Sequence, residues 1–257
     1  MRIGLRSLVL AVLLSCGTPP QAATPFADIV DQVRPAVVGV GTIDNLRSPP
    51  ARMYGTGFVV DKGNLVATNL HVVEAQLDGR HKEHLVVFVG RGPQADSRNV
   101  EVAATDRMHD LVLLRFEGAP LPTLHLAAEP AVREGNAVAF TGFPIGGVLG
   151  LYPVTHHGMV SALTPIATSA ARASQLSREK ISALRNPYEV IQLDAIAYPG
   201  NSGSPLYRRR DGAVVGIINQ VLVKSTKEDV LRDPSAITYA IPVGFLSALL
   251  STLADKH

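Results

Sequence analysis

Residues 55–68 read GTGFVVDKGNLVAT, two short apolar runs on either side of the turn-forming residues Asp61-Lys62-Gly63-Asn64. Short runs rich in β-branched residues and bounded by turn signals predict an antiparallel hairpin. The same alternation recurs along the chain, which favours an all-β sandwich or barrel. Strands are expected at residues 36–43, 57–60, 65–68, 85–89, 100–104, 111–116, 137–141, 154–161, 190–193, 204–207, 213–223 and 236–241.

Helical patterns are confined to the two ends of the domain. Apolar residues recur at helical spacing between Pro25 and Val33, and again over residues 243–254, so a short N-terminal helix and a C-terminal helix are expected. The Pro- and Ala-rich stretch 118–130 is interpreted as a connector. Residues 164–186 are polar and alanine-rich, fit no strand pattern and leave their role open.

Residues 1–23 have the layout of a secretory signal peptide: Arg2 and Arg6, an apolar run from Leu8 to Leu14, then small residues. The run is too short for a stable bilayer anchor, so no membrane span is expected in the mature chain. A buried N-terminal helix is the alternative. Leu-x-Ser-Cys at the sole cysteine, Cys16, also resembles a lipoprotein attachment box. The cleavage point and lipidation therefore stay open, with export to the periplasm or the medium as the expectation.

Composition and charge exclude several classes of protein. The 257 residues are 46% hydrophobic and 18% charged, as in a globular domain. The chain has 24 basic and 22 acidic residues, and the leader holds two arginines and no acid, so the mature domain is formally neutral. No basic footprint for nucleic acid remains. The run Arg208-Arg209-Arg210 is interpreted as part of an exposed hairpin turn, with a nucleic-acid patch as the weaker alternative.

Three segments place reactive residue types beside strands. His71 follows Thr68-Asn69 at a strand end, Asp110 immediately precedes the apolar run 111–116, and Ser202 lies in the turn PGNSGSPL at 199–206. A serine hydroxyl needs a neighbouring base to act as a nucleophile, imidazole can take its proton near neutral pH, and a carboxylate orients the imidazole. The order His, Asp, Ser matches one known order of such residues. The pattern predicts a catalytic triad of His71, Asp110 and Ser202.

The glycines around Ser202 allow backbone N–H groups to converge on one point. The amides of Gly200 and Ser202 are therefore the candidate oxyanion hole, where each donor is worth about 3 kcal/mol in comparable sites.

With these motifs in view, the sequence resembles the trypsin-like serine peptidases. The segments TNLHVV (68–73), DLVLL (110–114) and GNSGSPL (200–206) carry the likeness, and GFPIG (142–146) and DAIA (194–197) are similar to the bacterial HtrA/Deg branch. The resemblance covers about residues 26–250 and implies a chymotrypsin-like fold of two six-stranded antiparallel β-barrels. The protease domain is expected over residues 24–257, with barrels at about 34–118 and 130–242.

The resemblance also has limits. Members of that branch usually carry PDZ domains after the protease, and the chain is expected to lack one because it ends at His257, just past the closing helix. Peptide-gated control and trimer formation are therefore in doubt, and the oligomeric state stays open.

The same resemblance suggests a specificity pocket. Ile196 stands six residues before Ser202, where the pocket base is expected, with Asn219 and Val221 on its wall. No acid is available to pair with Lys or Arg. Cleavage after small or medium apolar residues is therefore expected.

The remaining histidines give no metal site. His81 and His84 lie near charged residues and are interpreted as exposed, whereas His156 and His157 would point to opposite faces of a strand. His109 is interpreted as a neighbour of Asp110 only, and no cofactor is implied. The resulting hypothesis is a secreted or periplasmic serine endopeptidase acting on unfolded or flexible polypeptides, for which the family resemblance implies a role in protein quality control. The alternatives are a catalytically silent module that binds unfolded chains and an esterase for small acyl esters.

Overall fold

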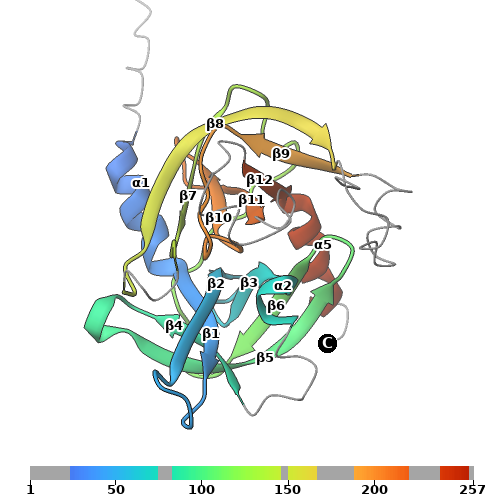
Figure 1. Ribbon diagram of the computed structural model, residues 1–257. Helices are drawn as coiled ribbons and strands as arrows, with labels where there is room; N and C mark the ends of the chain where they lie inside the picture. The colour runs from blue at the N-terminus through green and yellow to red at the C-terminus, as the bar shows by residue number, and fades with distance from the viewer. Residues whose placement is uncertain (1–23, 75–82, 146–149, 167–187, 220–237, 255–257) are drawn as a thin grey trace, which may run out of the picture.

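The computed structural model describes residues 24–74, 83–145, 150–166, 188–219 and 238–254, and the expected leader lies outside them. The strands in this part of the chain form two closed antiparallel barrels of six strands each. Figure 1 shows one barrel above the other, with the segment that carries α2 on the side of the first barrel that faces the second. The expected fold class is confirmed.

The first barrel has the strand order β1-β2-β3-β6-β5-β4 and closes through pairing of β1 with β4. The predicted hairpin is its β2–β3 pair, with Phe58 opposite Ala67 and the turn carried by Gly63 at φ +95°. The strands are β1 (Val37–Ile43), β2 (Ala51–Val60), β3 (Leu65–Asn69), β4 (His84–Val89), β5 (Asp96–Asp106) and β6 (Leu111–Phe116).

The second barrel has the order β10-β11-β12-β9-β8-β7 and closes through pairing of β10 with β7. Its strands are β7 (Ala137–Gly142), β8 (Val154–Pro165), β9 (Glu189–Leu193), β10 (Pro205–Arg208), β11 (Val214–Asn219) and β12 (Thr238–Pro242). β8 runs to Pro165, so residues 164 and 165 of the stretch 164–186 pair with β9, although that stretch was expected to fit no strand. Residues 167–186 of the stretch lie outside the described residues. Each barrel is therefore built from consecutive strands of one half of the chain.

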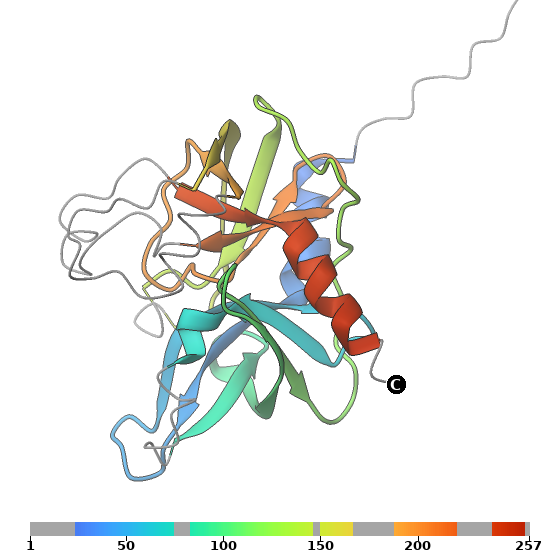
Figure 2. The same cartoon turned by 90° about the vertical axis from the view of Figure 1, so that its right-hand side faces the viewer.

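Helices join the two barrels at the ends of the chain. α1 (Phe26–Val33) precedes the first barrel but packs on the second, since Ile29 lies against Gly212 of the β10–β11 turn. α5 (Val243–Ala254) follows the second barrel and contacts β5 of the first as well as β11 and β12 (Figure 2). The short helices η1 (Arg34–Ala36), α2 (Leu70–Val73) and η3 (Gly92–Gln94) complete the described elements.

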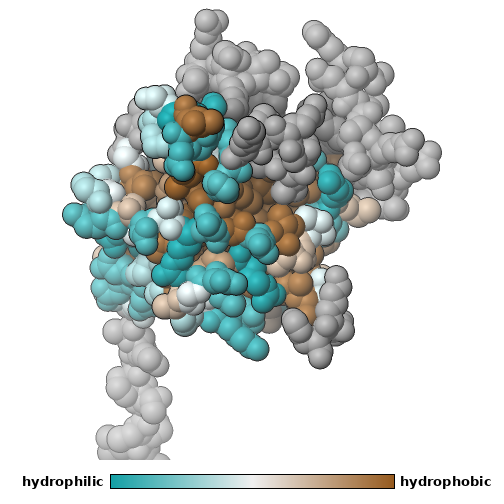
Figure 3. All heavy atoms as spheres, turned by 90° about the horizontal axis from the view of Figure 1, so that it is seen from below, coloured by the Kyte–Doolittle hydropathy of each residue, from teal (hydrophilic) through white to brown (hydrophobic). Residues whose placement is uncertain are grey.

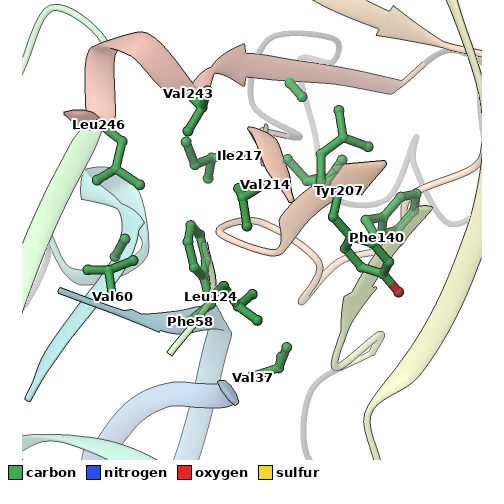
Figure 4. Close-up of a cluster of buried hydrophobic side chains, with 14 of the residues drawn as sticks. Val37, Phe58, Val60, Leu124, Phe140, Tyr207, Val214, Ile217, Val243 and Leu246 are labelled. Carbon is green, nitrogen blue, oxygen red and sulfur yellow. The ribbon is translucent and has the colours of Figure 1, made fainter. Parts of the chain in front are cut away.

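The connector also bonds to both barrels. The Leu124 amide donates to the carbonyl oxygen of Val59 at 3.0 Å in the first barrel, and the Ala127 amide donates to that of Val214 at 2.8 Å in the second. Figure 4 shows the resulting shared core, in which Leu124 lies among Phe58 of one barrel and Val214 of the other. The connector and the shared core thus pack the two barrels as one unit.

The described surface carries both hydrophilic and apolar side chains. Seen from below, hydrophilic side chains lie around an area of apolar side chains near the centre of the view (Figure 3). Among the described residues, no helix is long and apolar enough to cross a membrane.

Candidate active site

Strand pairing brings His71 and Asp110 together. β3 and β6 pair so that Asn69, the last residue of β3, lies opposite Leu111, the first residue of β6. His71 is two residues beyond Asn69 and Asp110 one residue before Leu111, so both leave the sheet at the same edge. The amide of Leu70 extends the ladder by donating to the Asp110 carbonyl oxygen at 3.0 Å.

The carboxylate of Asp110 holds His71 at two points. Its Oδ1 accepts the backbone N–H of His71 at 2.8 Å, and its Oδ2 lies 2.5 Å from ring Nδ1. A carboxylate can only accept, so the neutral imidazole carries its proton on Nδ1 and keeps the Nε2 lone pair available as a base. Asp110 reaches this geometry with φ +53°, a left-handed conformation that a non-glycine residue adopts at a cost of about 1 kcal/mol.

A third donor reaches the same carboxylate from the second barrel. Asn219 ends β11, is only 1% exposed, and its Nδ2 donates to Asp110 Oδ2 at 2.7 Å. Sequence reasoning placed Asn219 on the pocket wall and missed this bond. The sequence does carry one signal for a buried polar partner: Asn219 is the sole polar residue of the buried strand Val214–Asn219.

Ser202 lies in a turn whose backbone is bonded to both barrels. The Thr56 amide of β2 donates to the Ser202 carbonyl oxygen at 2.9 Å, and the Gly203 amide donates to that of Ile218 at 2.9 Å. Gly203 has φ +87°, and an ideal Cβ there would overlap the carbonyl oxygen of Thr56. Only glycine fits at this position, so the turn that presents Ser202 is determined by the close approach of β2.

Gly55 locates Ser202 relative to His71. An ideal Cβ on Gly55 would lie 3.0 Å from the Ser202 carbonyl oxygen and 2.8 Å from Val72 Cγ2. Val72 follows His71 directly in α2. The Ser202 turn of the second barrel and α2 of the first therefore approach β2 at the same residue, Gly55. This places Ser202 near the sheet edge where His71 and Asp110 meet.

Two amides near Ser202 remain available for a ligand. The amides of Asn201, Gly203 and Ser204 donate to backbone carbonyls, whereas those of Gly200 and Ser202 make no backbone hydrogen bond within the described part of the chain. The Ile145 amide donates to the Pro199 carbonyl oxygen at 2.5 Å. Because C=O and N–H point opposite ways in a trans peptide, this bond turns the Gly200 N–H away from Ile145.

The predicted pocket is only partly described. Ile196 is half-buried in the segment between β9 and Ser202, and the adjacent Ala197 amide donates to Thr238 Oγ1 at 3.0 Å. The Thr238 hydroxyl in turn donates to the Ala195 carbonyl oxygen at 2.5 Å, so β12 holds this segment in place. Val221 lies outside the described residues.

The other predicted histidines lie apart from His71. His84 is exposed at the start of β4, and His81 lies outside the described residues. On β8, His156 stacks on Phe140 with ring centroids 4.8 Å apart, and burial lowers its pKa. His157 packs edge-on against Phe26. No group of three metal-ligating side chains occurs among the residues that the structure covers.

Comparison with known proteins agrees with this geometry. The family model described as "Trypsin-like peptidase domain" matches residues 55–217. The chain is 30% identical over 257 residues to "Serine protease HTRA2, mitochondrial" of Bos taurus, covering 98% of this chain and 48% of that protein. It is 27% identical over 238 residues to "Serine protease HTRA3" of Rattus norvegicus, covering 90% and 45%.

A bacterial relative is matched over a similar share of both chains. The chain is 25% identical over 275 residues to "Probable periplasmic serine endoprotease DegP-like" of Halomonas elongata, covering 92% of this chain and 51% of that protein. The chain thus spans about half the length of each of these relatives.

Proposed function

Because the chain belongs to the trypsin-like peptidase family, we propose that it is a serine endopeptidase in which Ser202, His71 and Asp110 form the catalytic triad. The observation that carries the proposal is the double attachment of His71 to Asp110, through ring and backbone, at the edge that Ser202 reaches from the other barrel.

The mechanism follows from these positions. Ser202 Oγ attacks the carbonyl carbon of the scissile peptide bond while His71 Nε2 takes the hydroxyl proton. The tetrahedral intermediate carries a negative oxygen, which the amides of Gly200 and Ser202 stabilise. His71 then gives its proton to the leaving amine, and the acyl-enzyme is released by water that His71 activates in the same way.

Asp110 acts through His71 rather than on the substrate. Its charge stabilises the imidazolium formed in each proton transfer, its Oδ2 bond to Nδ1 keeps the ring from rotating, and Oδ1 holds the His71 backbone. Asn219 supports it by donating to Oδ2. No step requires a metal or an organic cofactor.

The preferred substrate is a flexible or unfolded polypeptide with a small or medium apolar residue before the cleaved bond. Ile196 at the proposed pocket base supports this preference, since an apolar base cannot pair with Lys or Arg. Export to the periplasm or the medium is supported by the leader-like residues 1–23, with lipid attachment at Cys16 as the alternative. The printed name of the Halomonas relative includes "periplasmic".

The test is labelling of the leader-free protein with a fluorophosphonate, followed by digestion of unfolded casein. The proposal predicts one modified residue, Ser202, and cleavage that disappears in Ser202→Ala. A folded protein that neither reacts nor cleaves casein would refute it. The mass of the secreted product reports the processing site and any lipid, and sequencing of the cleaved peptides tests the apolar preference.

A further inference from the structure

A second imidazole–carboxylate pair lies directly beside Asp110, in the turn between β5 and β6. His109 Nδ1 is 2.6 Å from Asp106 Oδ2, and the His109 backbone N–H donates to Asp106 Oδ1 at 3.1 Å. Burial alone would raise the pKa of Asp106, but the hydrogen bonds from His109 outweigh it and lower that pKa. The ring and backbone of His109 are thus both attached to one ionised carboxylate.

The His109 ring packs against two aromatic rings. It stacks on Phe245 with centroids 3.7 Å apart and planes at 16°, and it meets Tyr188 edge-on at 4.7 Å. Tyr188 and Phe245 also contact each other, with centroids 5.2 Å apart. The three residues form one cluster, here called the ring clamp.

The ring clamp joins the two barrels next to the active site. His109 belongs to the first barrel, Tyr188 immediately precedes β9 of the second, and Phe245 lies in the first turn of α5. Burial raises the pKa of Tyr188 to about 12, and the charges of Asp110 and Asp106 act in the same direction. The phenol therefore stays neutral and lies close to both carboxylates.

The ring clamp can affect the reaction rate because the proposed triad is divided between the two barrels. His71 and Asp110 come from the first and Ser202 from the second. A misplacement of about 1 Å between reacting groups costs about 100-fold in rate. Asp110 also has an unfavourable left-handed φ, which only its surroundings can hold in place. His109 is the residue bonded to it through the peptide chain.

We propose that His109 is a positioning residue of the active site, acting through Asp110. Its ring joins the Asp110 turn to Tyr188 and Phe245, and so sets the distance between the His71–Asp110 pair and Ser202. Asp106 orients the ring for this contact. The inference rests on the proposed endopeptidase function, and it makes His109 distinct from a neighbour of Asp110 that has no role of its own.

Three substitutions separate the ring's contact with Tyr188 and Phe245 from its hydrogen bond to Asp106, and all three keep the backbone N–H of residue 109. His109→Ala removes both side-chain contacts, His109→Asn keeps an amide donor for Asp106 without the aromatic ring, and His109→Phe keeps an aromatic ring without the donor. We expect kcat to fall about 10- to 100-fold in His109→Ala and His109→Asn, with KM nearly unchanged, and His109→Phe to recover most of it. His157→Ala is the matched control, since it also removes an edge-on histidine contact, at Phe26, far from Asp110 in the sequence.

Two further measurements exclude a general loss of stability. The downfield proton resonance of His71 Nδ1–H should shift or broaden in His109→Ala and keep its wild-type position in His157→Ala. The effect of His109→Ala on kcat should shrink in a Phe245→Leu background, because both changes open the same clamp.

Distinct outcomes test the inference and the proposed function. A folded His109→Ala with wild-type kcat and an unchanged resonance would overturn the inference, while the endopeptidase would stand. A wild type that fails to react would remove the proposed function, and the resonance would still report whether His109 positions Asp110. If His109→Ala does not fold, His109→Phe against Phe245→Leu gives the same comparison.

Discussion

Replacing Asn219 by aspartate puts a second carboxyl group beside Asp110 with almost no change in side-chain shape. Asn219 Nδ2 lies 2.7 Å from Asp110 Oδ2 and the side chain is buried. Two unit charges about 4 Å apart repel by about 4 kcal/mol at an effective dielectric constant near 20. Losing the hydrogen bond to a charged group adds about 2 kcal/mol. With both groups ionised, the folded state should therefore lose about 4–6 kcal/mol.

The loss should depend on pH in a definite direction. The new carboxyl has a raised pKa in the folded state, so it costs little below its unfolded pKa, and the penalty grows as the pH rises towards the folded value. Urea denaturation of Asn219→Asp between about pH 4 and pH 8 measures this. Asn219→Ala is the control: it loses only the hydrogen bond, about 2 kcal/mol, with little pH dependence.

The same substitution should alter reactivity, because the added negative charge favours the imidazolium form of His71. The acid limb of the rate of fluorophosphonate labelling should move to higher pH in Asn219→Asp and not in Asn219→Ala. If the two variants had the same stability profile and the same labelling profile, the placement of Asn219 beside an ionised Asp110 would be wrong.

Three further predictions follow from the same contacts. Gly203→Ala should destabilise the fold by about 2–4 kcal/mol in urea denaturation because its Cβ overlaps the backbone of β2, whereas Gly118→Ala, at φ +101° with nothing within 4 Å, should cost only about 1 kcal/mol. Ile145→Pro removes the amide that holds the Pro199 carbonyl and cannot adopt the observed φ of +60°, so both changes release residue 199 and should slow labelling of Ser202 at least about 10-fold. Ile145→Asn keeps that amide, suits the same φ and should label normally. Asp106 has a lowered pKa in the folded state, so its ionised form stabilises the protein above its unfolded pKa, and this stability is lost as the pH falls through the folded pKa. Asp106→Asn should therefore flatten the acid side of the curve of unfolding free energy against pH. An unchanged curve would contradict the pairing of Asp106 with His109.

Much of the architecture could be predicted from local sequence pattern. The β2–β3 hairpin and the helix at 243–254 follow from apolar runs and turn residues, which act over a few positions. The ends of the strands could be predicted less well. β2 begins at Ala51 rather than Gly57, because its first four residues are exposed or half-buried and mix polar with apolar types. β5 begins at Asp96 rather than Val100, because its first four residues are polar and give no apolar signal.

Contacts between distant parts of the chain could not be predicted from one sequence. The Asn219–Asp110 bond and the stacking of His109 on Phe245 join residues more than 100 positions apart. Their existence depends on the relative rotation of two barrels, which no local propensity encodes. A polar residue at the end of an apolar strand indicated that Asn219 had a partner without indicating which one.

The central claim is that Ser202, His71 and Asp110 act as one unit across the two barrels. The most direct test is the second-order rate of fluorophosphonate labelling, with the modified residue identified by mass spectrometry, in the wild type, His71→Ala and Asp110→Asn. The account predicts modification of Ser202 alone and a rate about 1000-fold lower in both variants. Labelling of Ser202 at the wild-type rate in a folded His71→Ala protein would contradict it.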